Sequence, residues 1–419
     1  MGHKYLRKNI TFWIPMSKSR SKSTFQVSFR STLFIGQIFS LIPVLGVFSN
    51  NVDDVRFVLT SWKCVYGFVS LLGQFFVVIM TTINLFHLNT TIAGTAQVIY
   101  CAAACITIVM FFQIAKSWPN LVQHIAHTLT MKCNVTCAIV LFLTLVQHIL
   151  SLFLAFAGSS IYYHQYTFYE GFVRYFYPWL FNYVPYSPVL GVLIQCLQIQ
   201  GTFIWNFADM FIICMSFYLT SRLNHVNKKL LAAQGKYLPE TFWRGRREDY
   251  GRTTQLVRKF DEVISGIIFI TFTNNLFSIC YQLYNTLEYA FNYGIKGTEE
   301  YSNHDQRISL LGGYEAVVFY SYSLVFLIVR STAVSLIASE VNSASMVPAP
   351  ILYDVPSPVY GVEVQRFLDQ VNGEKVALSG LQFFSITRGL LLNIAGTIVT
   401  YELVMFQFNI PYSADNSTI

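Results

Sequence analysis

The stretch Thr400-Tyr401-Glu402-Leu403-Val404-Met405-Phe406-Gln407-Phe408 lies near the end of the last apolar run of the chain. It places a Glu and a Gln five positions apart among aromatic and aliphatic residues. Lipid penalises both polar groups, so we expect them to face protein or water. A helix that only spans a bilayer has no need of such groups. The stretch therefore indicates a helix whose polar side faces protein or water and not lipid. If that side lines a pore, the chain is a channel.

The composition is that of a membrane protein. The chain has 419 residues, of which 54% are hydrophobic and 12% are charged, and its mean hydropathy is +0.46. A soluble domain carries about 25% charged residues. The net charge of +7 comes from basic residues that cluster in two segments, which are typical of cytosolic anchors. The sequence therefore predicts an integral membrane protein with several helices and no nucleic-acid partner.

Seven apolar runs are long enough to cross a bilayer, which takes about twenty residues. They predict an all-α integral membrane fold with seven transmembrane helices, here called spans one to seven. The runs are 62–85, 94–115, 135–158, 188–219, 261–293, 314–340 and 377–408.

The basic segments predict the orientation of these spans. Residues 1–33 carry seven Lys/Arg and no acid, and residues 220–260 carry ten Lys/Arg. The positive-inside rule places both in the cytosol, so an even number of crossings separates them. Spans one to four satisfy this, and an extra crossing at 33–48, which contains Pro43, would not. We therefore expect 33–48 to be a re-entrant or interfacial helix, the N-terminus to be cytosolic and the C-terminus to be extracellular.

The predicted organisation has five parts. No soluble domain, repeat or enzyme motif such as a P-loop or HExxH is present in the sequence, so we expect no enzyme activity and no cofactor. The eight cysteines lie in or beside apolar runs, so we expect buried thiols and not a metal site. The parts are a cytosolic N-terminus with the re-entrant helix (1–61), a ligand-binding bundle of spans one to six (62–340), a cytosolic connection (341–376), a pore helix (377–408) and an extracellular tail (409–419).

Span four contains Trp205-Asn206-Phe207-Ala208-Asp209. Trp205 and Asp209 are four residues apart and share a helical face. A sugar has hydroxyls that need acceptors and an apolar face that stacks on an aromatic ring, and a Trp beside a carboxylate offers both. The alternative is that Asp209 pairs with a neighbouring helix and Trp205 only packs. Both interpretations stay open, although an acid inside the membrane favours a functional role.

Other polar residues lie in the middle to outer part of spans three, five and six. Together they could form one outward-opening cavity, the usual form of a small-molecule site. For any one of them, a hydrogen bond between helices is the commoner role. Apart from Lys63 at the start of span one, no Lys is present in the spans, so a site built for an anion is not indicated. The candidate ligand residues are His148, Asn274, Asn275, Gln282, Tyr314 and Glu315, besides Trp205, Asn206 and Asp209.

Span seven has one narrow face of small, apolar and amide residues. Thr397, Thr400, Val404 and Gln407 follow one another at steps of three, four and three residues. Four copies of this face around an axis would make a pore without a ring of charge. Glu402 would then point toward neighbouring helices. A plain packing face is the alternative.

Residues 400–408 resemble the signature of insect gustatory receptors, a Thr-Tyr, a short apolar stretch and then Gln-Phe. Further stretches are similar to the sugar-receptor clade of that family and extend over nearly the whole chain. Met405-Phe406 departs from the more usual aliphatic pair, which implies a bulkier constriction. The similar stretches include Lys116-Ser117-Trp118-Pro119, Tyr186-Ser187-Pro188, residues 202–209, Asn274-Asn275-Leu276 and Ala395-Gly396-Thr397.

The resemblance implies a tetrameric, sugar-gated, weakly selective cation channel in the plasma membrane of gustatory neurons. The assembly that the resemblance implies is a homotetramer, or a heteromer with related receptors. The sugar would lie between spans three to six, near His148, Trp205, Asp209 and the amides of span five. Span seven would line the pore, with its gate at Gln407 and Phe408. Two other readings stay open: a gustatory channel for a non-sugar tastant such as a bitter compound, and a receptor coupled to G proteins or a transporter.

Overall fold

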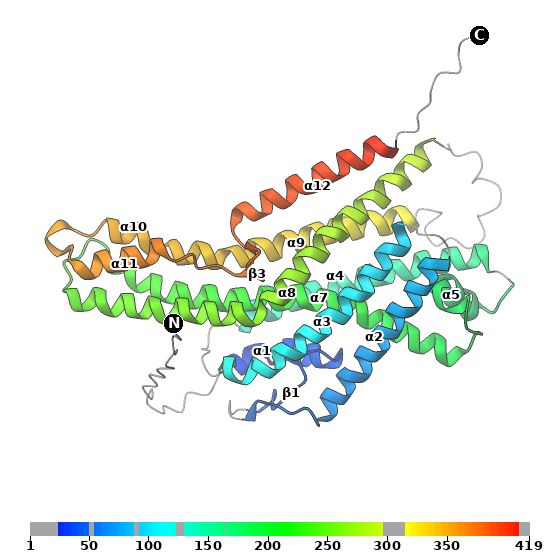
Figure 1. Cartoon of the computed structure of the whole chain (residues 1–419), viewed down its shortest axis with the longest axis horizontal. Coiled ribbons are helices and arrows are strands. Elements are labelled where there is room, and N and C mark those ends of the chain that lie inside the picture. Colours follow the sequence, from blue (N-terminus) through cyan, green and yellow to red (C-terminus); the bar gives the residue numbers. More distant parts are fainter. Residues whose placement is uncertain are drawn as a thin grey trace, which may run out of the picture.

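The computed structural model describes residues 24–49, 54–87, 92–122, 130–163, 165–295 and 315–409. It is an elongated helical bundle (Figure 1). The longer helices are α1 (Thr24–Ile38), α2 (Trp62–His87), α3 (Ile92–Val122), α4 (Thr130–Tyr162), α7 (Pro188–Leu231), α8 (Glu240–Ile295), α9 (Glu315–Met346) and α12 (Arg388–Asn409). The shorter ones are α5 (Phe168–Phe176), α6 (Pro178–Phe181), α10 (Pro348–Tyr353), a 3-10 helix η2 (Ser357–Val359) and α11 (Val362–Gly373).

Two small antiparallel hairpins interrupt the helices. They are β1 (Val44–Leu45) with β2 (Arg56–Phe57), and β3 (Ser379–Gly380) with β4 (Phe384–Ser385). In the first, Val44 pairs with Phe57, and in the second, Gly380 pairs with Phe384. Each hairpin precedes a long helix in the chain, α2 for the first and α12 for the second.

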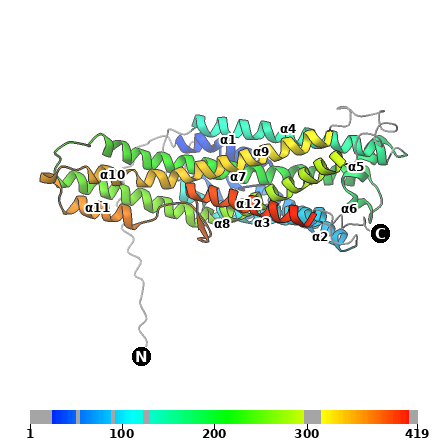
Figure 2. The ribbon, with the colours of Figure 1, turned by 90° about the horizontal axis from the view of Figure 1, so that it is seen from above.

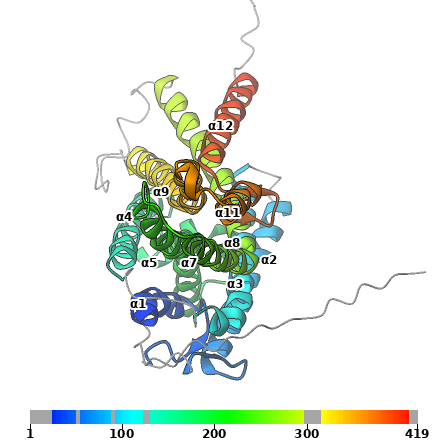
Figure 3. The same ribbon diagram turned by 90° about the vertical axis from the view of Figure 1, so that its left-hand side faces the viewer.

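Within the described residues, six helices are long and apolar enough to cross a bilayer: α2, α3, α4, α7, α8 and α9. They correspond to spans one to six, and the apolar runs therefore gave the correct helices. Figure 3 shows α7 near the middle of the bundle, with other helices around it. It packs against α3, α4, α8 and α9. The run Phe203–Ser216 of α7 is almost entirely buried, as expected for a helix that is apolar on all sides.

The helices α7 and α8 are much longer than a bilayer requires. With 44 and 56 residues they extend over roughly 66 Å and 84 Å, against a hydrocarbon core of about 30 Å. Their adjoining ends pack with α10 and α11 at one end of the molecule (Figures 1 and 2). We call this end the distal bundle, residues 220–260 and 341–373. Tyr250 donates there to the Ser345 carbonyl at 3.0 Å, which ties α8 to α9.

The N-terminal apolar run differs from its prediction. The helix expected over 33–48 is α1, which begins at Thr24 and ends at Ile38. Ser40 and Ile42 follow with positive φ angles of 65° and 50°, a conformation that ends a helix. Tertiary contacts hold this turn in place, since Gln200 of α7 donates to Ser40 Oγ at 2.7 Å and to the Phe39 carbonyl at 3.2 Å.

The last apolar run also differs from its prediction. Residues 377–387 are not helical but carry β3 and β4, so the helix begins at Arg388 and not at residue 377. Leu381 and Gln382 have positive φ angles of 49° and 63°, and this tight turn between the two strands is incompatible with a helix. The resulting α12 lies against α8 and α9 and forms one side of the bundle (Figure 1).

Candidate functional site

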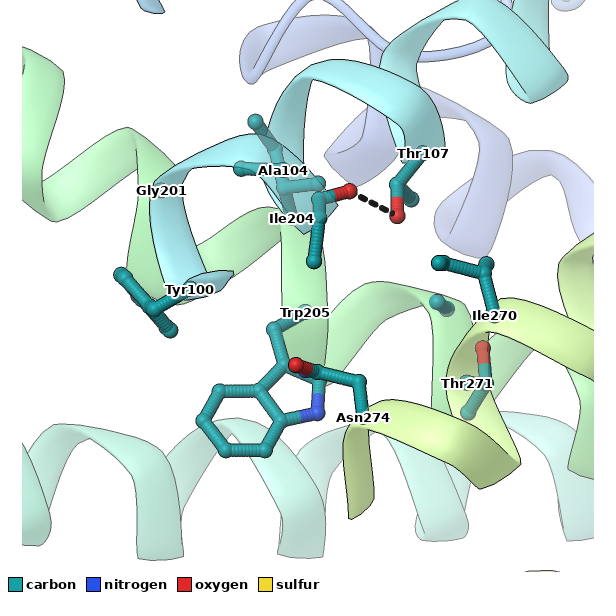
Figure 4. Close-up of a pocket in the computed structure, with 11 residues that line it drawn as sticks. Tyr100, Ala104, Thr107, Gly201, Ile204, Trp205, Ile270, Thr271 and Asn274 are labelled. Carbon is teal, nitrogen blue, oxygen red and sulfur yellow. Dashed lines mark hydrogen bonds between the residues drawn. The ribbon is translucent and has the colours of Figure 1, made fainter. Parts of the chain in front are cut away.

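A small pocket lies between α3, α7 and α8 (Figure 4). Its cavity volume is about 10 Å³, counted over the positions that the centre of a water molecule can take, which is about the room that one water needs. A larger ligand does not fit into this space in the described conformation. The lining residues are Tyr100, Ala103, Ala104, Thr107, Gly201, Ile204, Trp205, Ala208, Ile270, Thr271 and Asn274.

Two threonines of the pocket differ in how their hydroxyls are used. Thr107 donates to the Ala103 carbonyl of its own helix at 2.7 Å (dashed line in Figure 4). The Thr271 hydroxyl has no hydrogen-bond partner among the described residues, although Thr271 is only 2% exposed. Such a hydroxyl costs about 1–3 kcal/mol. Asn274 lies on the same face of α8, three residues further on. The Thr271 hydroxyl and the Asn274 amide thus form a polar strip on an otherwise mainly apolar wall.

The Trp205 indole is fixed by contacts on two sides. Its Nε1 donates to Asn275 Oδ1 at 2.8 Å, and the Tyr100 ring meets it edge to face at 5.6 Å. Asn275 in turn donates to Asp209 Oδ1 at 2.9 Å. Asn274 therefore faces the pocket, while its neighbour Asn275 links α8 to α7 behind the pocket wall.

Asp209 is completely buried and forms an ion pair with Arg330 of α9, whose side chain is 4% exposed. Arg330 Nε lies 2.7 Å from Asp209 Oδ2, at an angle that is not that of a linear hydrogen bond. Arg330 also donates to Asn206 Oδ1. Asp209 thus pairs with neighbouring helices, and neither it nor Arg330 is among the residues that line the pocket.

Arg330 is the residue that the sequence-based interpretation missed. The absence of Lys from the middle of the spans is no sign that cations are absent there, because Arg330 lies in the middle of span six. The signal was present in the sequence, since one charged residue in the run Phe326-Leu327-Ile328-Val329-Arg330 demands a partner inside the bundle. Asp209 is that partner. The pair neutralises the local charge, so the polar core as a whole suits neutral ligands.

The other candidate ligand residues lie apart from this pocket. His148 is a half-buried residue of α4, and the adjacent Gln147 donates to Ser323 of α9 at 2.7 Å. Gln282 lies two turns beyond Asn275 on α8, with a buried Nε2 that has no partner within the described part of the chain. Glu315 is buried at the start of α9. Tyr314 lies outside the described residues.

The candidate pore residues lie on α12. Thr397 and Thr400 are exposed, and their hydroxyls donate to the carbonyls of Asn393 and Gly396, each at 2.9 Å. Val404 is 44% exposed. The side chains of Glu402, Gln407 and Phe408 lie outside the described residues. Because the hydroxyls bond within their own helix, this face of α12 presents methyl groups and satisfied oxygens.

The pocket has the form of a binding site for a small molecule. An aromatic ring, a hydroxyl and an amide meet around a small space inside the helical bundle. No cluster of three metal-ligating side chains occurs within the residues that the structure describes. These features are consistent with the predicted role as a receptor or channel.

The fold is similar to that of a solved insect olfactory receptor. The chain superimposes on the insect olfactory receptor OR5 from Machilis hrabei, solved in complex with eugenol, with a TM-score of 0.64 at 15% identity. The alignment covers 93% of this chain and all of that one. At this level of identity, the likeness shows a shared fold.

The chain belongs to the trehalose receptor family, whose model matches residues 14–293 and 307–417. Among its relatives in Drosophila melanogaster is gustatory receptor 5a for trehalose, 29% identical over 92% of this chain and 85% of the relative. Another is the gustatory receptor for sugar taste 64a, 27% identical over 90% and 83% of the two chains. The predicted membership in the gustatory receptor family is confirmed, and the chain is a multi-span membrane protein of that family.

Proposed function

We propose that this chain is a sugar-gated, weakly selective cation channel in the plasma membrane of gustatory neurons. The family and the named sugar specificity of its relatives support a sugar as the ligand. The observation that carries the proposal is the pocket of Trp205, Thr271 and Asn274. It places the Trp205 ring near an amide and a hydroxyl that has no partner among the described residues, in a pocket whose other walls are mainly apolar.

The chemistry of a sugar fits these three side chains. The apolar face of a pyranose or furanose ring stacks on the Trp205 indole. Its hydroxyls accept from and donate to Thr271 and Asn274, each of which can do both. Asp209 acts indirectly in this arrangement, because it holds Asn275 and not the ligand. His148, Gln282, Tyr314 and Glu315 remain proposed contacts of a wider, opened cavity.

The proposed pore is formed by four copies of α12. Its face of Thr397, Thr400 and Val404 would line the axis, with Gln407 and Phe408 as the gate. A short apolar constriction of this kind closes by excluding water. This architecture requires α12 to be a seventh span, with the N-terminus in the cytosol and the C-terminus outside. Related receptors could replace some of the four subunits.

Gating follows from the size of the pocket. A cavity with room for about one water has to widen before a sugar enters. A ligand shifts an equilibrium between two states only by its difference in affinity for them. We infer that the described conformation is sugar-free and that a sugar stabilises a state in which α3, α7 and α8 lie further apart.

The test is electrical recording from cells that express the chain, with a panel of neutral sugars and, separately, a panel of bitter compounds. Currents evoked by at least one sugar are expected. Silence toward every sugar, with the protein present at the cell surface, would overturn the proposal.

A channel for a non-sugar tastant is the second candidate. The composition of the pocket lining favours it. Asp209 does not line the pocket, and most of the lining residues are Ala, Ile and aromatic residues. Responses to bitter compounds without responses to sugars would select it. A receptor coupled to G proteins or a transporter is a third reading. A C-terminal tag that is stained only after permeabilisation would favour that reading over both channel proposals.

A further inference from the structure

Arg330 contacts two aromatic rings in addition to its ion pair. The centre of its guanidinium group lies 4.9 Å from the centroid of the Trp205 ring and 5.3 Å from that of Phe326. A cation over an aromatic face is attracted by the electron density of the ring, most strongly for Trp. The guanidinium therefore lies close to a ring of the pocket wall and to a ring of its own helix, and Arg330 itself does not line the pocket.

These contacts close a ring of four side chains from three helices. Trp205 donates to Asn275, Asn275 donates to Asp209, Asp209 pairs with Arg330, and Arg330 lies over Trp205. Each member is thus held on two sides. The indole is held at its edge by the amide and at its face by the guanidinium, which together restrict the rotation of the ring about both side-chain bonds.

Arg330 also reaches the second aromatic wall of the pocket. It donates to Asn206 Oδ1, and Asn206 donates to the Thr202 carbonyl at 2.8 Å. The Thr202 hydroxyl accepts a hydrogen bond from the Tyr100 hydroxyl at 3.3 Å. Both Tyr100 and Trp205 are therefore connected to one guanidinium that has no contact with the cavity.

We propose that Arg330 is a positioning residue for the ligand pocket: its guanidinium fixes the orientation of the Trp205 indole on which the ligand stacks. The inference rests on the proposed function insofar as the ligand is a sugar. A charge-balancing partner for Asp209 needs only a positive group, which Lys also supplies. Fixing Trp205 needs in addition a cation that pairs with Asp209, donates to Asn206 and still lies over the indole ring. The extended planar guanidinium of Arg can make these contacts together, whereas the compact ammonium of Lys cannot.

The decisive variant removes both charges at once. In Asp209→Asn/Arg330→Gln no unpaired charge is left in the membrane, so folding and delivery to the cell surface are preserved. The receptor is labelled with 5-fluorotryptophan, and the fluorine NMR signal of Trp205 is assigned with Trp205→Phe. We expect the Trp205 signal of the double variant to shift and broaden without any ligand, because the ring samples several orientations. The matched control is Arg244→Gln/Glu248→Gln, an exposed pair of α8, which should leave that signal unchanged.

Recordings with sugar supply the second readout. The half-maximal sugar concentration of the double variant is expected to rise about ten-fold, the size of effect that a cation–aromatic contact supports. In a Trp205→Leu background the same double substitution should raise the half-maximal sugar concentration less than about two-fold further, because Arg330 and Trp205 act as one unit. Arg330→Lys, which keeps the positive charge, covers the case in which the double variant fails to reach the surface. It should reach the surface with an altered Trp205 signal.

An unaltered Trp205 signal in the double variant, or in Arg330→Lys if only that variant folds, would overturn the inference and leave Arg330 as a charge partner only. The NMR readout needs no ligand. If wild-type channels ignore every sugar, the proposed function fails, while the fluorine signal still decides the role of Arg330.

Discussion

Asp261 of α8 accepts two hydrogen bonds from Ser379, one from its backbone N–H at 2.6 Å and one from its hydroxyl at 2.7 Å. Ser379 begins the β3–β4 hairpin that leads into α12. Asp261 is ten residues from Thr271 on the same helix, about 15 Å along its axis. One continuous helix therefore carries both a wall of the pocket and the attachment of the proposed pore helix.

The variant Asp261→Ala should loosen that attachment. It leaves the Ser379 N–H and hydroxyl without their acceptor, at a cost of about 1–3 kcal/mol. We expect a lower thermal unfolding temperature of the purified receptor and, in recordings, a smaller maximal current with little change in the half-maximal sugar concentration. Glu262→Ala is the matched control, since Glu262 is the adjacent acid and is exposed. An equal fall in unfolding temperature and maximal current in both variants would contradict the role of Asp261 in attaching the hairpin.

The variant Thr271→Val should stabilise the ligand-free receptor. It removes a buried hydroxyl that has no partner among the described residues and keeps nearly the same shape, so a gain of about 1 kcal/mol is expected. Thr107→Val is the control, because it removes a hydroxyl that is already bonded to the Ala103 carbonyl. Thermal unfolding without ligand compares the two. Destabilisation of Thr271→Val would show that a water or a residue outside the described part bonds to this hydroxyl.

Breaking the buried ion pair from one side should be severe. Asp209→Ala leaves Arg330 charged and without its counter-ion in the membrane, at a cost of about 3–5 kcal/mol. Surface staining should show strong retention inside the cell. An exposed pair is worth at most about 1 kcal/mol, so Glu248→Ala, which breaks the pair with Arg244, should reach the surface normally. Normal delivery of Asp209→Ala would mean that Arg330 finds another partner.

The distal bundle should lose stability in acid. Burial tends to raise the pKa of Glu363, but its hydrogen bonds and ion pairs with Arg247 and Arg366 outweigh this and hold the pKa below its usual value. A group whose pKa is lower in the folded state stabilises that state above its unfolded pKa, about 4.3. This contribution disappears as the pH falls through the lower, folded value.

The measurement is the unfolding temperature of wild type and Glu363→Gln between neutral pH and about pH 3, the range in which carboxylates titrate. The variant should be less stable at neutral pH, and the difference should shrink as the pH falls below about 4. A difference that stays constant over this range would contradict the role of the Glu363 charge.

The sequence predicted the helices well because lipid makes their signal simple. Long apolar runs gave spans one to six. The segments around Ser40 and Leu381 were not predictable in this way. Their turns use positive φ angles at residues other than glycine, and contacts from Gln200 and Asp261, distant in sequence, hold them.

The site was predictable only in part. Trp205 and Asn274 could be singled out, since a Trp near an acid and a pair of amides are unusual in a membrane helix. Tyr100, Thr107 and Thr271 carry no such signal, because a single Thr in an apolar helix usually bonds to its own backbone. Whether the hydroxyl of such a Thr is hydrogen-bonded, as in Thr107, or has no partner among the described residues, as in Thr271, depends on how the helices pack. Arg330 did carry a signal, which a search for Lys alone overlooked.

The most direct test of the account compares sugar dose–response curves of wild type, Thr271→Val and Thr107→Val in cells with equal surface expression. If a sugar bonds to the free Thr271 hydroxyl, the half-maximal sugar concentration should be about ten-fold higher in Thr271→Val, which is the effect of losing one hydrogen bond of about 1.4 kcal/mol. Thr107→Val should stay within about two-fold of wild type, since its hydroxyl is bonded within α3. Unchanged responses in Thr271→Val, or equal shifts in both variants, would contradict a sugar site in this pocket.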